Sequence, residues 1–141
     1  MSLVQTATNA FKTGMMNAAY NFTSDTFKIA LYTANASLDA TTSAYTTTEE
    51  VSATGYTAGG QTLTVSVTPT TGSGTGTIAY ISFADVTWSA AITARGALIY
   101  KVGSGNPTVC VLDFGGDKTS SNSFKVQFPT PGSTTSIVRI A

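Results

Sequence analysis

The sequence predicts an all-β domain, and three observations carry this prediction. Threonine and serine make up about 30% of the 141 residues, and the branched Cβ of threonine favours extended backbone. Several segments alternate apolar and polar residues, as half-buried strands do. Clusters of glycine, proline and asparagine separate these segments at the short spacings of a sandwich or barrel. We therefore expect a β-sandwich of about eight strands, jelly-roll-like in topology, with one short N-terminal helix.

Seven segments are strand candidates. Alternation is clearest in residues 124–128 and 61–68, where apolar side chains point to one face and polar ones to the other. The candidates are residues 26–33, 61–68, 76–83, 94–102, 108–114, 121–128 and 135–140. Turn chemistry is found at residues 71–74, 103–107, 115–117 and 129–132.

The rest of the chain fits a single domain spanning residues 1–141. Within the N-terminal segment 1–23, apolar residues share a helical face, which predicts a helix over residues 5–20. Residues 35–58 form a long polar connection. Its apolar residues Leu38, Tyr45 and Val51 can anchor it as a cover over the core.

Composition argues against catalysis. The chain has no histidine, one cysteine and 10% charged residues, whereas most enzymes at neutral pH use a titrating side chain, an acid pair or a bound metal. We therefore expect no enzyme activity and no cofactor. Seven basic and seven acidic residues balance, so nucleic acid is not an expected partner. No segment reaches the length of a membrane span, and no membrane contact is expected.

The short chemical motifs have simpler explanations. Residues 72–76 are glycine-rich, but a β-type segment follows them, which favours a hairpin over a phosphate loop. Asp113 and Asp117 have oxygen ligands for Ca²⁺, yet a polar strand end followed by a turn needs no metal and is the favoured explanation. Glu49 and Glu50 are adjacent and are expected on the solvated surface. Cys110 lies in an apolar run and is expected to be buried.

Three residues are candidates for a contact surface. Trp88 and Tyr56, with Tyr80 and Tyr100, have the large aromatic faces that bind sugars, although core packing is the more common use of such residues. Arg95 interrupts an uncharged stretch. It is expected to meet a carboxylate or a neighbouring subunit, with simple exposure as the alternative.

Five blocks occur in an order that resembles a class of small virion proteins of tailed bacteriophages. The first two are Ser-Asp-Thr-Phe-Lys-Ile-Ala-Leu-Tyr-Thr at residues 24–33 and Gly-Tyr-Thr-Ala-Gly-Gly-Gln-Thr-Leu at 55–63. The others are Val-Thr-Trp at 86–88, Ala-Arg-Gly-Ala-Leu-Ile-Tyr at 94–100 and Asp-Phe-Gly-Gly at 113–116. Together with the N-terminal segment, these blocks extend over nearly the whole chain.

The resemblance implies a structural role in the virion. Its closest functional match is a capsid decoration or cement protein, which binds the shell of major capsid protein and stabilises it. It further implies a location on the capsid surface after synthesis in the bacterial cytoplasm. Self-association as a dimer or trimer is expected, because oligomers usually follow closed symmetry. A tail or tail-fibre component and a module that adheres to host glycans are the alternatives.

Overall fold

The computed structural model describes residues 2–72 and 78–140, which form one helix and ten strands. The helix is α1 (Asn9–Met16). The strands are β1 (Thr6–Ala7), β2 (Phe27–Tyr32), β3 (Gln61–Leu63), β4 (Val65–Thr71), β5 (Ala79–Phe83), β6 (Val86–Trp88), β7 (Thr93–Lys101), β8 (Thr108–Thr119), β9 (Phe124–Val126) and β10 (Val138–Ile140).

The strands form three antiparallel sheets. The largest has the order β1-β8-β7-β2-β3, a second has the order β10-β5-β4, and β6 pairs with β9. The all-β prediction with one short helix is therefore confirmed. These strand orders do not establish a jelly roll, which stays a prediction.

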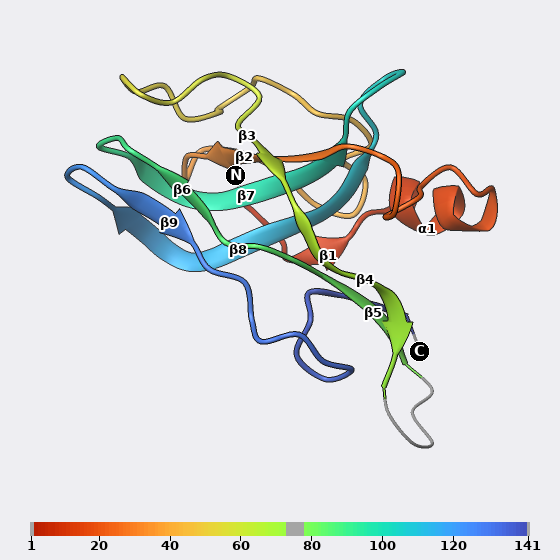
Figure 1. The fold of residues 1–141 in the computed structure, drawn as a ribbon. Coiled ribbons are helices and arrows are strands. Elements are labelled where there is room, and N and C mark those ends of the chain that lie inside the picture. Colours follow the sequence, from red (N-terminus) through yellow and green to blue (C-terminus); the bar gives the residue numbers. More distant parts are fainter. Residues whose placement is uncertain (1, 73–77, 141) are drawn as a thin grey trace.

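The central strands of the large sheet are buried on both faces. In β2, Phe27, Ile29 and Leu31 face one hydrophobic cluster, whereas Ala30 and Tyr32 face another. Side chains alternate between the faces of a strand, so a strand with five buried residues in six needs a cover on each side. Figure 1 shows these covers: the 33–60 segment (orange to yellow) lies on one side of the sheet, and β4 and β5 lie on the other.

The larger cluster, here the main core, lies between the large sheet and the two smaller ones. It is rich in aromatic rings, including a stacked pair of Phe22 and Phe27 with ring centroids 4.6 Å apart. Residues from α1 (Phe11), β9 (Phe124) and β10 (Val138) all contribute. This cluster ties the helix and all three sheets together.

The smaller cluster, here the minor core, lies under the 33–60 segment. It contains Leu38 and Tyr100, with Tyr45 packed against it. Backbone hydrogen bonds fasten the segment at several points, including Val51 N–H to the Leu31 carbonyl and Thr33 N–H to the Glu49 carbonyl, both 2.9 Å. The prediction of a cover anchored by Leu38, Tyr45 and Val51 is confirmed, although Val51 belongs to the main core.

The helix is shorter than residues 5–20, and that prediction is wrong at both ends. Residues 6 and 7 are strand β1, where Thr6 pairs with Val111. Thr8 then caps the helix by accepting the Phe11 N–H at 3.2 Å. After Met16 the chain turns back at Ala18, whose φ is 56°. Gly14 makes this return possible, because a Cβ there would lie 2.3 Å from the Tyr20 ring.

Two other boundaries were not predictable from alternation alone. The run 61–68 is divided between β3 and β4 at Thr64, whose carbonyl accepts the Ala84 N–H at 2.8 Å, so one run of residues joins two sheets. The predicted turn at residues 115–117 is wrong, since these residues lie inside β8. The register there shifts between Ala94 and Gly96, and Gly115 has a φ of 81°, as at a β-bulge.

The remaining strand predictions agree in position with β2, β5, β7, β9 and β10, each of which is shorter than its candidate or offset by a residue. β1 and β6 were not predicted, since they have only two and three residues. Most of the predicted hairpin at residues 72–76 lies outside the described residues. The strands on either side of it, β4 and β5, pair antiparallel.

Candidate functional site

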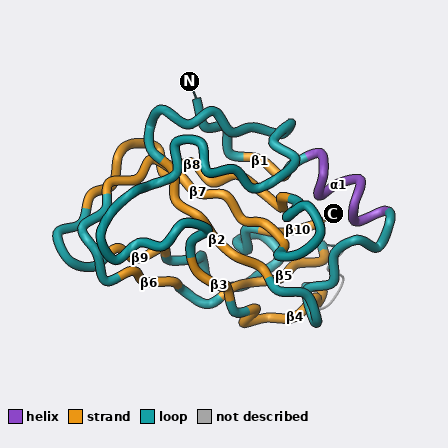
Figure 2. Tube along the Cα trace, turned by 90° about the horizontal axis from the view of Figure 1, so that it is seen from above, coloured by secondary structure: helices purple, strands orange, loops and turns teal. Residues whose placement is uncertain are grey.

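A groove lies near the N- and C-terminal strands, between two sheet edges. It lies between β1 and β10 and has a volume of about 290 Å³. Consecutive residues line it on each side, Gln5 to Ala7 at the start of β1 and Thr135 to Arg139 where the chain enters β10, so it runs along these two segments rather than along one strand face. In Figure 2, β10 lies between β5 and the strands β1 and β8. We call this the β1–β10 groove.

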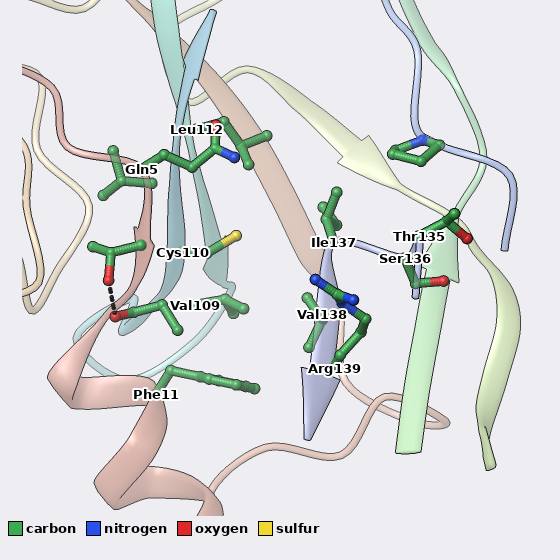
Figure 3. Close-up of a pocket in the computed structure, with 14 residues that line it drawn as sticks. Gln5, Phe11, Val109, Cys110, Leu112, Thr135, Ser136, Ile137, Val138 and Arg139 are labelled. Carbon is green, nitrogen blue, oxygen red and sulfur yellow. Dashed lines mark hydrogen bonds between the residues drawn. The ribbon is translucent and has the colours of Figure 1, made fainter. Parts of the chain in front are cut away.

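The groove has an apolar floor and a polar rim. Figure 3 shows Phe11, Val109 and Cys110 on one side and Val138 on the other, with the sulfur of Cys110 pointing toward β10. Arg139 is the charged residue in its lining. Such a surface is suited to contact with another protein rather than to proton transfer.

Cys110 does not supply a nucleophile. Burial raises the pKa of its thiol to about 12, so it is protonated at neutral pH and unreactive. This agrees with the predicted buried role, since its side chain belongs to the main core. Within residues 2–72 and 78–140, no group of three His, Cys, Asp or Glu residues is arranged to hold a metal ion.

The half-buried carboxylate of Glu50 organises a polar network. It accepts the hydroxyls of Tyr45 at 2.6 Å and Tyr56 at 2.7 Å, and the backbone N–H of Gly59 at 2.7 Å. The Tyr56 hydroxyl in turn accepts the Leu31 N–H at 2.9 Å, on the outer edge of β2. The expectation that Glu50 is solvated surface is therefore wrong, because the 33–60 segment folds over it.

The tyrosines around this carboxylate are held in their neutral form. Burial, together with hydrogen bonds to Glu50, raises the pKa values of Tyr45 and Tyr56 well above their usual range. Burial and the nearby Glu50 charge raise the pKa of Tyr100 to about 12. Tyr100 donates to the Gly59 carbonyl at 2.7 Å. The network fastens the cover to the sheet.

Two of the three predicted contact residues lie in the interior. Trp88 is 2% exposed and Tyr56 is 9% exposed, and their rings stack 5.9 Å apart in the main core. Tyr100, another of the four candidate aromatics, is also buried, at 3%. The aromatic side chains proposed for sugar binding therefore do not form a common surface. The Trp88 indole N–H is the buried side-chain polar atom that has no partner within the described part of the chain.

Arg95 contacts a carboxylate, which confirms one of the two contacts predicted for it. Its Nε donates to Asp113 Oδ1 at 3.1 Å across β7 and β8. Asp113 also accepts the Gly115 N–H at 2.9 Å, and this bond and the one from Arg95 lower the pKa of its carboxyl. Asp113 thus stabilises the β8 bulge with Arg95, which explains its position without Ca²⁺.

The β1–β10 groove and the network around Glu50 were not predicted, because each is formed by segments that are far apart in the chain. The pattern Glu-Glu in a polar connection has no signal for burial. The free strand edges depend on pairing partners that alternation does not identify.

No helix in the described residues is long and apolar enough to cross a membrane. Comparisons of the chain with protein-family models, with curated proteins and with solved structures gave no match.

Proposed function

We propose that this protein is a structural component of a tailed-bacteriophage virion, a decoration or cement protein that binds the major capsid protein shell and stabilises it. The observation that carries the proposal is the place of the phage-like blocks in the fold. Residues 24–33 contain β2, and residues 94–100 lie in β7, which are two of the three interior strands of the large sheet. The resemblance thus concerns a scaffold, and it fits a protein whose task is to present surfaces.

The chemistry of the surface also supports a binding role. Only 10% of the residues are charged, so little charge must be desolvated when a second protein covers the molecule. The β1–β10 groove has an apolar floor that a partner side chain can fill. A modest contact per copy is sufficient for a decoration protein, because the shell repeats the contact many times.

Reconstitution tests the proposal directly. Purified protein is added to phage particles that lack it, and the particles are imaged by electron cryo-microscopy. We expect regular density over the capsid lattice. Density confined to the tail would replace the proposal with a tail or fibre component, and the absence of added density would overturn both.

A charge variant tests the contribution of the groove. Arg139 is exposed and borders the groove, whereas Lys12 is exposed on α1 and does not. If the groove contacts the shell, Arg139→Glu lowers the occupancy on particles and Lys12→Glu leaves it unchanged. Equal occupancy of the two variants would exclude the groove from the contact.

A further inference from the structure

A second groove lies between two consecutive strands that do not pair with each other. β8 pairs with β7 and β1, and β9 pairs with β6, so the hairpin-like connection at residues 120–123 leaves β8 and β9 apart. The space between them has a volume of about 440 Å³. We call it the β8–β9 groove.

The walls of this groove are strand edges. On β9, Phe124, Lys125 and Val126 all border it, and consecutive residues point to opposite faces of a strand. On β8, the neighbours Lys118 and Thr119 do the same. A hollow that both faces reach lies along the edge, where backbone N–H and C=O groups point outward.

These two edges have no strand partner in the part of the chain that the structure describes. β1 pairs with β8 only through Val111 and Cys110, so the outer edge of β8 beyond Leu112 is left without a neighbouring strand. β9 is the end strand of a two-stranded sheet. Unpaired edges are sites where an extended segment of another protein adds as a strand.

The charges at the groove select the occupant. Lys118 and Lys125 line it from opposite walls, and no acidic residue is part of its lining. Lys125 lies 3.4 Å from an oxygen of Asp85, in a pair that is largely exposed, and Lys118 has no ion-pair partner among the described residues. The groove therefore has positive charge, chiefly that of Lys118, which a carboxylate can neutralise.

The floor of the groove is aromatic. Phe114 and Phe124 lie there with ring centroids 6.3 Å apart. An extended peptide directs alternate side chains to opposite sides. It can therefore place apolar side chains on these rings while acidic ones face the lysines.

We propose that the β8–β9 groove binds an extended, acidic segment of a partner protein, which pairs with a strand edge and places its carboxylates near Lys118 and Lys125. This inference goes beyond the proposed function and does not depend on which part of a virion the protein joins. Strand edges and an aromatic floor favour a peptide over a nucleic acid, which would be held mainly by several cations on its phosphates. The groove has only two.

Peptide binding tests the proposal. The probe is a fluorescently labelled heptapeptide of alternating valine and glutamate, and its matched control has glutamine in place of glutamate. At low ionic strength we expect saturable binding of the acidic peptide by fluorescence anisotropy and weaker binding of the control. Equal binding of the two peptides, or no saturable binding of the acidic one, would overturn the proposal.

Protein variants locate the site. Lys118→Gln and Lys125→Gln are each expected to lower the affinity for the acidic peptide by about threefold, the size of an exposed ion pair. The double variant is expected to lower it by about tenfold. Lys12→Gln is the matched control on α1 and leaves binding unchanged. If it lowers the affinity for the peptide as much as the groove variants do, the peptide is attracted by the overall charge of the protein and the proposal fails.

Two further probes separate strand pairing from charge. Methylation of alternate backbone nitrogens removes the hydrogen-bond donors of one peptide edge, and one of the two alternate sets is expected to abolish binding. An oligothymidylate of equal charge is expected to bind at least tenfold more weakly, on the order of the difference that backbone pairing contributes. Undiminished binding of both methylated peptides, or binding of the oligothymidylate as tight as that of the peptide, would refute the proposal.

Discussion

The two faces of the large sheet are covered in different ways. On the main-core side, strands and the helix bury aromatic and branched side chains against it. On the minor-core side, the 33–60 segment covers it with isolated β-bridges and turns and no named strand or helix. Figure 1 shows the contrast between the paired ribbons below the sheet and the open loop above it.

A polar segment can therefore cover a sheet without a regular strand or helix of its own. The main core is held by apolar area, whose contribution is spread over many residues. The cover has few apolar anchors, and its position depends on individual hydrogen bonds that converge on Glu50. Changes in the main core should therefore lower global stability, whereas changes around Glu50 should release the cover before the sheet unfolds.

The largest effect is expected for Phe27→Ala. Phe27 is 1% exposed and stacks on Phe22, so its loss should lower the free energy of unfolding by about 3–5 kcal/mol. The measurement is urea unfolding followed by Trp88 fluorescence. The matched change on the other face is Leu38→Ala, for which about 2 kcal/mol is expected because the loop can partly collapse into the space. A larger loss for Leu38→Ala would reverse the comparison.

Gly60→Ala should prevent the 33–60 segment from packing against β2. The φ of Gly60 is 77°, and a Cβ there would lie 1.7 Å from the Ile29 carbonyl oxygen. We expect a loss of about 2–3 kcal/mol, from strain and displaced contacts. Gly116→Ala is the control, since nothing lies within 4 Å of its Cβ position. Equal unfolding midpoints for the two variants would show that stability does not depend on the close packing of Gly60 against β2.

Glu50→Gln tests the polar network. The amide keeps the size of the side chain but places an N–H₂ group among donors, which leaves at least one buried donor unpaired and costs about 2 kcal/mol. Hydrogen exchange should become faster in residues 45–60 before it changes in β7 and β8. Glu49 is the exposed neighbour of Glu50, and Glu49→Gln should alter neither the free energy of unfolding nor the exchange rates. A uniform increase in exchange throughout the sheet would mean that the cover is not an independent unit.

The smallest effect concerns alkaline pH. The pKa of Tyr100 is raised in the folded protein to about 12, above its value of about 10 in an unfolded chain. The folded state thus favours the protonated hydroxyl, and this stability is complete below about pH 10 and is lost as the pH rises toward about 12. Tyr100→Phe should cost about 1 kcal/mol at neutral pH through the lost bond to Gly59. It should also make the alkaline decline less steep, and an unchanged decline in urea midpoints would contradict the assignment.

How far the sequence predicts the structure differs between the two faces. The strand alternation of residues 124–128, the buried thiol of Cys110 and the anchors Leu38 and Tyr45 follow from local pattern, and each is confirmed. The role of Glu50 does not, because the burial of a carboxylate depends on the tyrosines and the glycine N–H that the folded loop brings to it. Likewise, residues 115–117 have turn composition, yet pairing with β7 holds them in a bulged strand.

Local sequence pattern is sufficient for the fold class and for the buried side of a strand with one wet face, such as residues 124–128, since the period of two is a property of neighbouring residues. The sequence also determined the poverty of titratable groups, which follows from composition alone. Three features depend on the tertiary structure. They are the crossing of one apolar run between two sheets at Thr64, the strand edges that have no strand partner, and the burial of Glu50 rather than Glu49. Those outcomes depend on contacts between residues distant in the chain, and no local pattern encodes the energy of such contacts.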